Sequence, residues 1–260
     1  MVMPCRGRNL RLKNDETGFS LVELLMVVAI SSIVIAIIAN IYIAQSKRYA
    51  TTDSIANIQQ DLRGVLAILP MEIRLAGCDP TKSNVPGIIT ATRNSFRFTM
   101  DTKDNAIPRL NVSDGQVNGD EDIAYGFAGN GDSNGNGIVD NGGADWSGTA
   151  SLGRGIGGAA LQPLVDDLAD NIEALEFCYL IDDDNDASTP PVQSLAPPVT
   201  MINRIRAVQV SILARAANPE RGFLNTNTYT TASGVVWNPP DDNFHRRLEV
   251  INIQCRNMGL

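Results

Sequence analysis

The 260-residue sequence predicts an α+β fold, in which a long N-terminal helix, transmembrane and then amphipathic, packs on an antiparallel β-sheet. Two observations lead to this prediction. An uncharged apolar stretch near the N-terminus passes directly into a stretch with helical periodicity. Further along, apolar residues recur with a period of two between turn-rich segments, as they do in strands that bury one face.

Charge and composition narrow the classes of function. The chain carries 21 Lys and Arg against 29 Asp and Glu, a formal net charge of −8, whereas nucleic-acid binders are usually basic. His245 is the one histidine in the sequence, which argues against a histidine-based active site and against a multi-histidine metal site. We therefore expect a non-enzymatic protein with no nucleic-acid partner.

The apolar stretch Leu24–Ile43 has no charged residue and is long enough to cross a bilayer as a helix. It is too long for a secretory signal peptide, and no small-residue cleavage site closes it. Basic residues are more numerous before the stretch than after it: Arg6, Arg8, Arg11 and Lys13 precede it, and Lys47 and Arg48 follow. The positive-inside rule then places the N-terminus in the cytoplasm and most of the chain across the membrane.

Glu23 distinguishes this stretch from a plain membrane anchor, because a carboxylate in hydrocarbon is costly. It lies five residues after Gly18 in the string KNDETGFSLVEL, residues 13–24. This string closely resembles the prepilin signature of type IV pilins and type II secretion pseudopilins. The resemblance implies that a membrane prepilin peptidase cuts between Gly18 and Phe19, and that the new amine of Phe19 is methylated.

The same resemblance implies a role for Glu23 in filament assembly. In a dry bundle of helices its carboxylate would pair with the N-terminal amine of a neighbouring subunit. The implied organisation is a leader peptide at residues 1–18, a transmembrane and filament-core half of the helix at 19–51, and a periplasmic globular pilin head at 52–260. The protein would first reside in the bacterial inner membrane, and later in a filament on the cell surface.

The helical pattern continues beyond the apolar stretch. One face carries apolar residues at steps of three or four: Ile55, Ile58, Leu62, Leu66, Leu69 and Ile73. A single helix is therefore expected from about Phe19 to Leu75. Pro70 predicts a bend or break just before it, and Gly77 with Pro80 is a usual helix stop.

Six strands are predicted from period-two patterns: Gly87–Thr92, Ser95–Met100, Asp122–Phe127, Ile172–Ile181, Ile205–Arg215 and Arg247–Cys255. Each longer strand has one clearly apolar face, which favours a sheet covered on one side. Two short helices are expected, near Leu161–Ala169 and Ala214–Asn218. The glycine-rich run 153–158 (GRGIGG) is interpreted as a flexible loop, because it lacks the strand–helix setting of a dinucleotide site.

Several scattered segments resemble the PilW family of minor pilins: 61–63 (DLR), 74–78 (RLAGC), 205–208 (IRAV), 213–215 (LAR), 243–247 (NFHRR) and 256–257 (RN). Each segment is short, and together they favour a minor pilin over a major one. The resemblance implies that the partners are other minor pilins, the major pilin, the prepilin peptidase and the inner-membrane assembly platform.

A calcium site is expected in the segment 132–140 (DSNGNGIVD), which matches the first nine positions of an EF-hand-type loop. The ligands would be the side chains of Asp132, Asn134, Asn136 and Asp140 with the carbonyl of Ile138. The twelfth position is glycine, not the usual bidentate acid, and Asp145 follows two residues late. A polar loop that needs no ion is the alternative.

Other polar features have simpler interpretations. The acidic run 182–186 (DDDND) is expected to be a solvated loop, with a second ion site as the alternative. His245 is interpreted as a turn or surface residue. Three cysteines follow the leader, and strand parity turns Cys178 away from the apolar face that Cys255 shares with Ile251 and Ile253. Cys78–Cys255 is therefore the expected disulfide, with one cysteine left over.

The sequence as a whole predicts a minor type IV pilin that helps to initiate or cap the pilus. A type II secretion pseudopilin is the nearest alternative, because it shares the leader and the long helix. A membrane-tethered adhesin or ligand-binding domain is the alternative of a different class, because surface loops can bind ligands without a sequence signature.

Overall fold

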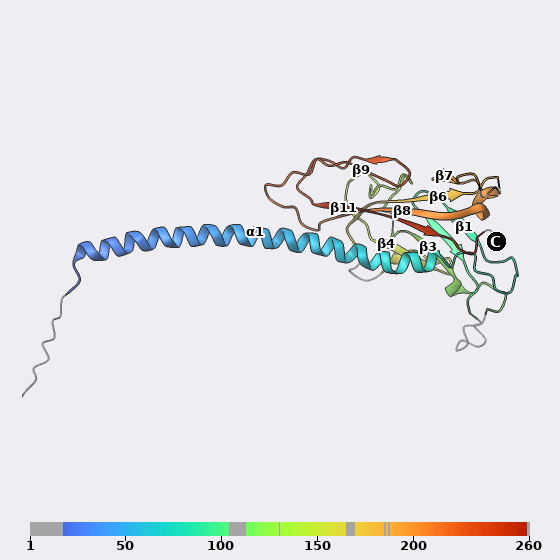
Figure 1. Ribbon diagram of the computed structural model, residues 1–260, viewed down its shortest axis with the longest axis horizontal. Helices are drawn as coiled ribbons and strands as arrows, with labels where there is room; N and C mark the ends of the chain where they lie inside the picture. The colour runs from blue at the N-terminus through green and yellow to red at the C-terminus, as the bar shows by residue number, and fades with distance from the viewer. Residues whose placement is uncertain are drawn as a thin grey trace, which may run out of the picture. The chain divides into compact units, whose positions relative to one another are not determined.

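The computed structural model describes residues 18–103, 113–129, 131–164, 170–184, 186 and 188–258. The chain divides into two compact units, residues 1–50 and residues 51–260. We call the second unit the head. The helix α1 (Leu21–Ile73) contributes its first part to one unit and its last part to the other (Figure 1).

The helix α1 begins and ends within two residues of its predicted bounds. A bend or break was expected just before Pro70. The break is wrong, because the helix continues through this residue and the Arg74 amide donates to the Pro70 carbonyl at 3.2 Å. The bend stays a prediction. Pro70 lies in the last turns, where its missing N–H costs only one bond. Leu69 and Ile73 are fully buried on either side of it, and this packing holds the final turn in place.

The two parts of α1 differ in burial. Every described residue from Gly18 to Tyr49 is exposed. The part that belongs to the head buries a narrow stripe instead: Ile58, Leu62, Val65, Leu69 and Ile73. Ile55 and Leu66 were expected in this stripe, but both are only partly covered, and Val65 takes the central place.

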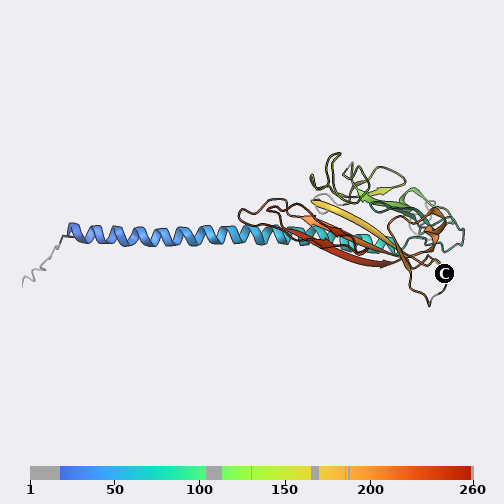
Figure 2. The same cartoon turned by 90° about the horizontal axis from the view of Figure 1, so that it is seen from above.

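The head contains two larger antiparallel sheets and a small hairpin (Figures 1 and 2). The five-stranded sheet has the order β1-β2-β3-β4-β5, with β1 Ile88–Ala91, β2 Phe96–Thr99, β3 Asp122–Phe127, β4 Leu152–Ile156 and β5 Gln162–Pro163. The four-stranded sheet has the order β11-β8-β6-β7, with β11 Arg246–Gln254, β8 Ile205–Arg215, β6 Ile172–Ile181 and β7 Val192–Ser194. The hairpin pairs β9 (Tyr229–Thr230) with β10 (Val236–Trp237), and two short 3-10 helices, η1 (Gly119–Glu121) and η2 (Val199–Arg204), lead into β3 and β8.

All six predicted strands are present, and three of them have the predicted bounds: β3, β6 and β8. The flexible loop expected at 153–158 is wrong, because Gly153 and Gly155 lie inside strand β4. A Cβ on Gly153 would lie 2.8 Å from the Leu161 side chain, and one on Gly155 would lie 2.8 Å from the Ala159 carbonyl oxygen. Glycine is therefore needed where another segment passes close to the strand.

The two short helices are also not found among the described residues. Residues 162–163 form β5, and residues 165–169 lie outside the described residues. Residues 214–215 complete β8, and a bend follows at 217–218. In both cases pairing with a neighbouring strand determines the local structure, which short-range helix propensity does not anticipate.

The four-stranded sheet is covered on both faces, contrary to the expectation of one. One face joins the main core, which contains the stripe of α1 and the buried residues of the five-stranded sheet. On the other face lies a smaller cluster around Trp237, Leu213 and Ala174. The hairpin β9–β10 provides this cover, and the Ser211 hydroxyl and Glu176 carboxylate on the sheet bind its turn.

Candidate functional site

The start of α1 is capped by Ser20. The Ser20 hydroxyl accepts the Glu23 amide at 3.2 Å, and the Ser20 carbonyl accepts the Leu24 amide at 3.1 Å. Gly18 and Phe19 precede the helix, and Phe19 is 82% exposed. The Gly18–Phe19 peptide bond therefore lies before the hydrogen-bonded helix.

Besides pairing between subunits, this geometry gives a local reason for an acid at position 23, namely helix capping. Ser20 and Glu23 have the spacing of a capping box, in which a serine caps the helix and the acid lies three residues later. A carboxylate in the first turn also interacts favourably with the positive end of the helix dipole. The sequence signal for this cap is the S-x-x-E pattern of residues 20–23, which the resemblance to prepilins does not use.

The first part of α1 exposes an apolar surface all around. The structure describes one helix that is long and apolar enough to cross a membrane, and 0% of its most apolar 18-residue window is buried. Isolated soluble proteins rarely leave so large an apolar surface uncovered. The first part of α1 must therefore be covered by lipid or by other helices.

Within the head, a polar cluster fastens α1 to the five-stranded sheet. Glu72 of α1 accepts hydrogen bonds from Tyr125 of β3 at 2.5 Å and from Arg154 of β4 at 2.8 and 2.9 Å. Burial, together with the charge of Glu72, raises the pKa of Tyr125. The sequence did not indicate this cluster, because its three members come from distant segments and one of them lies in the strand that was not predicted.

A second polar cluster lies on the outer face of the four-stranded sheet. The side chains of Glu173 and Arg246 are both fully buried, and they bind each other at 2.5 and 3.1 Å. Asp242 also binds Arg246, at 2.5 and 2.7 Å. Although burial alone lowers it, the pKa of Arg246 is raised above its ordinary value by hydrogen bonds to Asp242 and Glu173.

Arg215 completes this cluster. It donates to Glu173 at 3.0 Å and lies over the ring of Phe244, 4.2 Å from its centroid. Arg215 and Arg246 come from two of the segments that resemble PilW, and both bind the one buried acid, Glu173. A bulge in β6 turns Glu173 toward them, since the pairing register shifts between Ile172 and Ala174.

Two further PilW-like segments meet at the other end of the head. The Asn257 side chain donates to the Arg74 carbonyl at 3.3 Å, where the chain leaves α1. Gly77 has a φ of 69° and packs so closely on Met258 that a Cβ would lie 2.3 Å from its sulfur. Arg206 also reaches this end and donates to the Met258 carbonyl at 2.9 Å. The resemblance therefore reflects contacts that fix the C-terminal strand relative to α1.

The segment 132–140 folds as a compact loop held by its own side chains. Asp132 accepts the amides of Gly135 and Gly137 at 2.8 Å each. Asp145 approaches from the far side and accepts the side-chain amides of Asn134 at 3.0 Å and Asn136 at 2.8 Å. Asp145, which follows two residues after the twelfth position, thus lies beside Asn134 and Asn136, the third and fifth positions of the loop.

The remaining predicted ligands have other partners. Asp140 accepts the backbone amides of Ser133 and Gly142 at 3.0 Å each, and these bonds lower its pKa. Ile138 forms a bridge with Ala174 of β6. Among the described residues, no group of three or more His, Cys, Asp or Glu side chains is arranged to hold a metal ion. Calcium binding here stays a prediction.

In the acidic run 182–186, the described carboxylates Asp184 and Asp186 accept hydrogen bonds from nearby residues. Asp184 accepts the Asp186 amide at 2.9 Å and the Thr189 hydroxyl at 2.8 Å. Asp186 binds the Ser188 amide and hydroxyl. These bonds lower the pKa of both carboxyls, which stay exposed.

His245 is more buried than a surface residue. Its side chain is 19% exposed, and its Nε2 lies 2.6 Å from Glu220. The imidazole stacks on Phe223 with 3.9 Å between ring centroids. This pair holds the segment before β11 in place, and the hydrogen bond lowers the pKa of Glu220.

The expected disulfide between Cys78 and Cys255 is not formed in the structure, which holds Cys78, Cys178 and Cys255 as free thiols. The parity argument itself was right about the faces, since Cys255 lies in the main core and Cys178 does not. Burial raises the pKa of Cys255 to about 12 and that of Cys178 to about 11, so both stay protonated at neutral pH.

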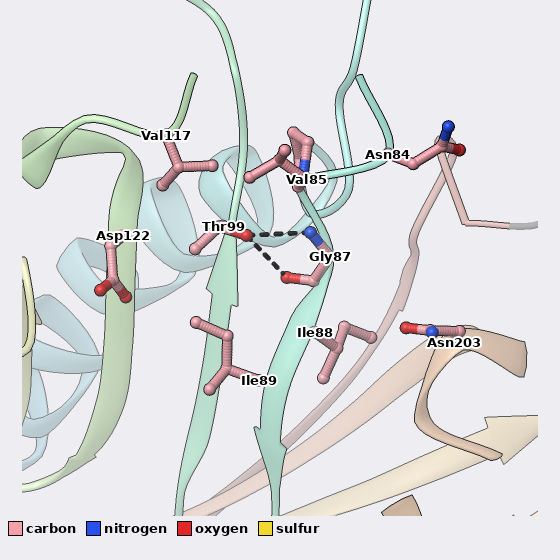
Figure 3. A pocket seen from close by; sticks show the side chains of 10 residues that line it. Asn84, Val85, Gly87, Ile88, Ile89, Thr99, Val117, Asp122 and Asn203 are labelled. Carbon is pink, nitrogen blue, oxygen red and sulfur yellow. Dashed lines mark hydrogen bonds between the residues drawn. The ribbon is translucent and has the colours of Figure 1, made fainter. Parts of the chain in front are cut away.

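The surface of the head has shallow, open grooves. Figure 3 shows one of about 390 Å³, in which the Thr99 hydroxyl bonds both the amide and the carbonyl of Gly87. Asn203 of η2 and Asn84 line its rim. A neighbouring groove of about 810 Å³ shares both asparagines.

Two parts of the chain match known protein families. Residues 13–39 match the prokaryotic N-terminal methylation motif, and residues 139–257 match the family of type IV pilus-assembly protein W, PilW. A type IV-like pilin from Thermus thermophilus is similar in structure, with a TM-score of 0.42 and 16% sequence identity over 77% of this chain and 96% of that one. No curated protein matches the chain.

The methylation motif followed by the apolar helix and the sheet-bearing head define the class: the chain is a type IV pilin-like prepilin. Within this class, the match of residues 139–257 to the PilW family supports a type IV minor pilin. This agrees with the class and family expected from the sequence. The methylation motif and the apolar helix indicate membrane anchoring, and the family match suggests contact with other pilus components.

Proposed function

We propose that this chain is a minor pilin that is cut between Gly18 and Phe19, methylated at Phe19, and then helps to initiate or cap a type IV pilus. The observation that carries the proposal is the contrast within α1. Its head part is buried by the head itself, whereas the residues from Phe19 to Tyr49 have no cover of their own. An assembled bundle of pilin helices would supply that cover after the membrane has done so.

The proposed topology follows from the same features. The N-terminus lies in the cytoplasm, the first part of α1 crosses the inner membrane, and the head lies in the periplasm. The proposed partners are the prepilin peptidase, the assembly platform, the major pilin and other minor pilins. The head has no catalytic role in this proposal.

A role at the start or tip of the filament can be tested by deleting the chain from its own organism. We expect surface pili to be lost or strongly reduced, with protein secretion unchanged, and to return when the full chain is supplied again. Loss of secretion with normal pili would instead support a type II secretion pseudopilin. Normal pili and normal secretion, with lost attachment to a surface, would support an adhesin.

Calcium binding by the loop 132–140 is a separate proposal. Its support is the position of the Asp145 carboxylate, which the bonds from Asn134 and Asn136 hold beside the loop. With no acid at the twelfth position, the affinity expected is that of weak extracellular sites, on the order of 10⁻⁴–10⁻³ M.

A further inference from the structure

The two long edges of the four-stranded sheet differ in how their backbone groups are satisfied. At one edge, β6 is hydrogen-bonded by segments from several parts of the chain. In order along β6 these are Ala150, Gly137 with Val139, the carbonyl of Arg93, and strand β7. The bonds to Ile172, Leu175 and Phe177 measure 3.0, 2.8 and 2.7 Å. This edge is closed to a further strand.

At the other edge, β11 pairs with β8 alone. The Ala216 amide donates to His245 at 2.8 Å and the Cys255 amide donates to Arg206 at 2.9 Å, so the odd-numbered residues direct their backbone groups toward β8. The pairing has no register shift between these points. The even-numbered residues of β11 therefore direct their amides and carbonyls outward. The structure records no hydrogen bond from any described residue to those of 248, 250, 252 or 254.

The last five residues of β11 also lack the usual protection of an edge strand, whereas charged residues mark the first four. Such strands are commonly short, bulged, or marked by proline or charge, because a free regular edge pairs with other chains. β11 has nine residues, no bulge and no proline, and its last five residues (VINIQ, 250–254) carry no charge. Val250 is 46% exposed, and Asn252 and Gln254 are exposed as well.

We propose that the outer edge of β11 is a docking site at which an extended strand from the head of a different pilin-like subunit is added to the sheet. A row of outward amides and carbonyls recognises the backbone of an extended chain, and gives both affinity and register. The identity of the partner as a pilin-like subunit rests on the proposed function. Figure 2 shows β11, in dark red, along the border of the head.

Direction and length argue against a second copy of this chain as the occupant. The other edge strands, β1, β5 and β7, have four, two and three residues, so only a second β11 could match all nine. Two β11 strands would pair antiparallel through a twofold axis.

That axis would reverse α1 as well. His245, just before β11, binds Glu220, which in turn binds Thr51 of α1, and Asn257, just after it, binds Arg74 at the end of α1. β11 thus runs along the head part of α1 in the same direction. Under the proposed function, subunits join one filament head to tail and are not related by a twofold axis. The added strand must therefore come from a different chain.

The proposal can be tested with the full chain in its own cells by comparing Val250→Pro with Val250→Ala. The Val250 amide faces outward, so proline removes a free donor and obstructs the edge without breaking a bond to β8. Alanine shortens the same side chain but keeps the amide. We expect Val250→Pro to lower the amount of chain in sheared filaments by about tenfold, as for the loss of one or two ladder bonds.

The control measurements separate this proposal from the proposed function. Val250→Ala should remain within about twofold of the wild type, and both variants should keep wild-type leader cleavage and membrane level. If Val250→Pro enters filaments as well as Val250→Ala does, the edge proposal is overturned while the proposed function stands. If the wild-type chain itself is missing from filaments, both are overturned.

A photo-crosslinking residue at Asn252, with one at Val192 of β7 as the matched control, identifies the occupant. We expect a cross-linked product from position 252 whose partner itself carries a prepilin leader, and none from position 192. A product formed with a second copy of this chain, or no product from position 252, would contradict the proposal.

Discussion

The two parts of α1 have the same helical geometry but differ in how far their apolar side chains are buried. From Leu21 to Tyr49 the apolar residues surround the helix and are exposed, whereas from Thr51 to Ile73 they form one buried stripe. The difference shows that a single helix can serve two environments in succession. The head covers its own part, whereas the described residues provide no cover for the first part.

The largest expected effect is on filament entry, through Glu23. If its charge pairs with a neighbouring subunit's amine, Glu23→Gln and Glu23→Leu should both abolish incorporation into filaments, because neither carries the charge. If helix capping is what matters, Glu23→Gln should keep incorporation, since glutamine also suits the third helical position. Immunoblots of sheared filaments measure the difference, with head stability as the control that should not change.

The next effect is on the free energy of unfolding of the head, which substitutions in the two parts of α1 should change differently. Leu69 is fully buried and Leu25 is 60% exposed. Leu69→Ala should lower the free energy of unfolding of the head by about 2–5 kcal/mol, the cost of a buried cavity. Leu25→Ala should leave it unchanged. Denaturant unfolding of the detergent-solubilised full chain measures both, and equal effects would contradict the division.

A smaller effect concerns pH at the contact between α1 and the five-stranded sheet. The pKa of Tyr125 is raised from its ordinary value of 10.0, so the folded head holds this proton more tightly than the unfolded chain does. This contribution is complete below pH 10 and is lost as the pH rises above it.

Thermal midpoints measured from about pH 8 to about pH 11 should therefore fall more steeply for the wild type than for Tyr125→Phe. Glu72→Gln is the matched variant, because it keeps the shape of the partner but removes its charge. Parallel pH curves for the wild type and Tyr125→Phe would show that this contact does not anchor the helix.

The smallest expected effect is that of calcium on the head. At a hundredfold excess over the dissociation constant, binding to the folded state alone would add about 2.7 kcal/mol, and less at millimolar calcium if the site is weak. The midpoint of the full chain should rise with calcium, little with magnesium, and not at all for Asp132→Ala. An unchanged midpoint for the wild type would leave the segment as a polar loop, and membrane association of the first part of α1 should be unaffected in every case.

The sequence was sufficient to predict the long helix and the long strands, because their periodicity extends over many residues. Strand β4 was hidden by Gly153 and Gly155, which the close passage of residues 159 and 161 requires. The second covered face of the four-stranded sheet was also missed. Glu173 and Glu176 indicate an exposed face when read alone, and only the fold brings Arg215, Arg246 and Arg93 to them.

For the candidate site, the leader, Phe19 and Glu23 could be recognised because their signature is continuous in the sequence. The capping role of Ser20 needed only attention to S-x-x-E. By contrast, the free edge of β11 could not be predicted, since strand order depends on contacts between segments that are far apart in the sequence. Pairing across long sequence separations is set by the fold rather than by local pattern.

The most direct test of the account is the N-terminal sequence of the chain purified from its own membranes and filaments. Mass spectrometry should find a mature chain that begins at Phe19 with one added methyl group on its amine. Gly18→Ala is a control that should block this processing and leave residues 1–18 attached. A wild-type chain that keeps those residues, or that begins at any other position, would contradict the assignment of this protein as a processed pilin subunit.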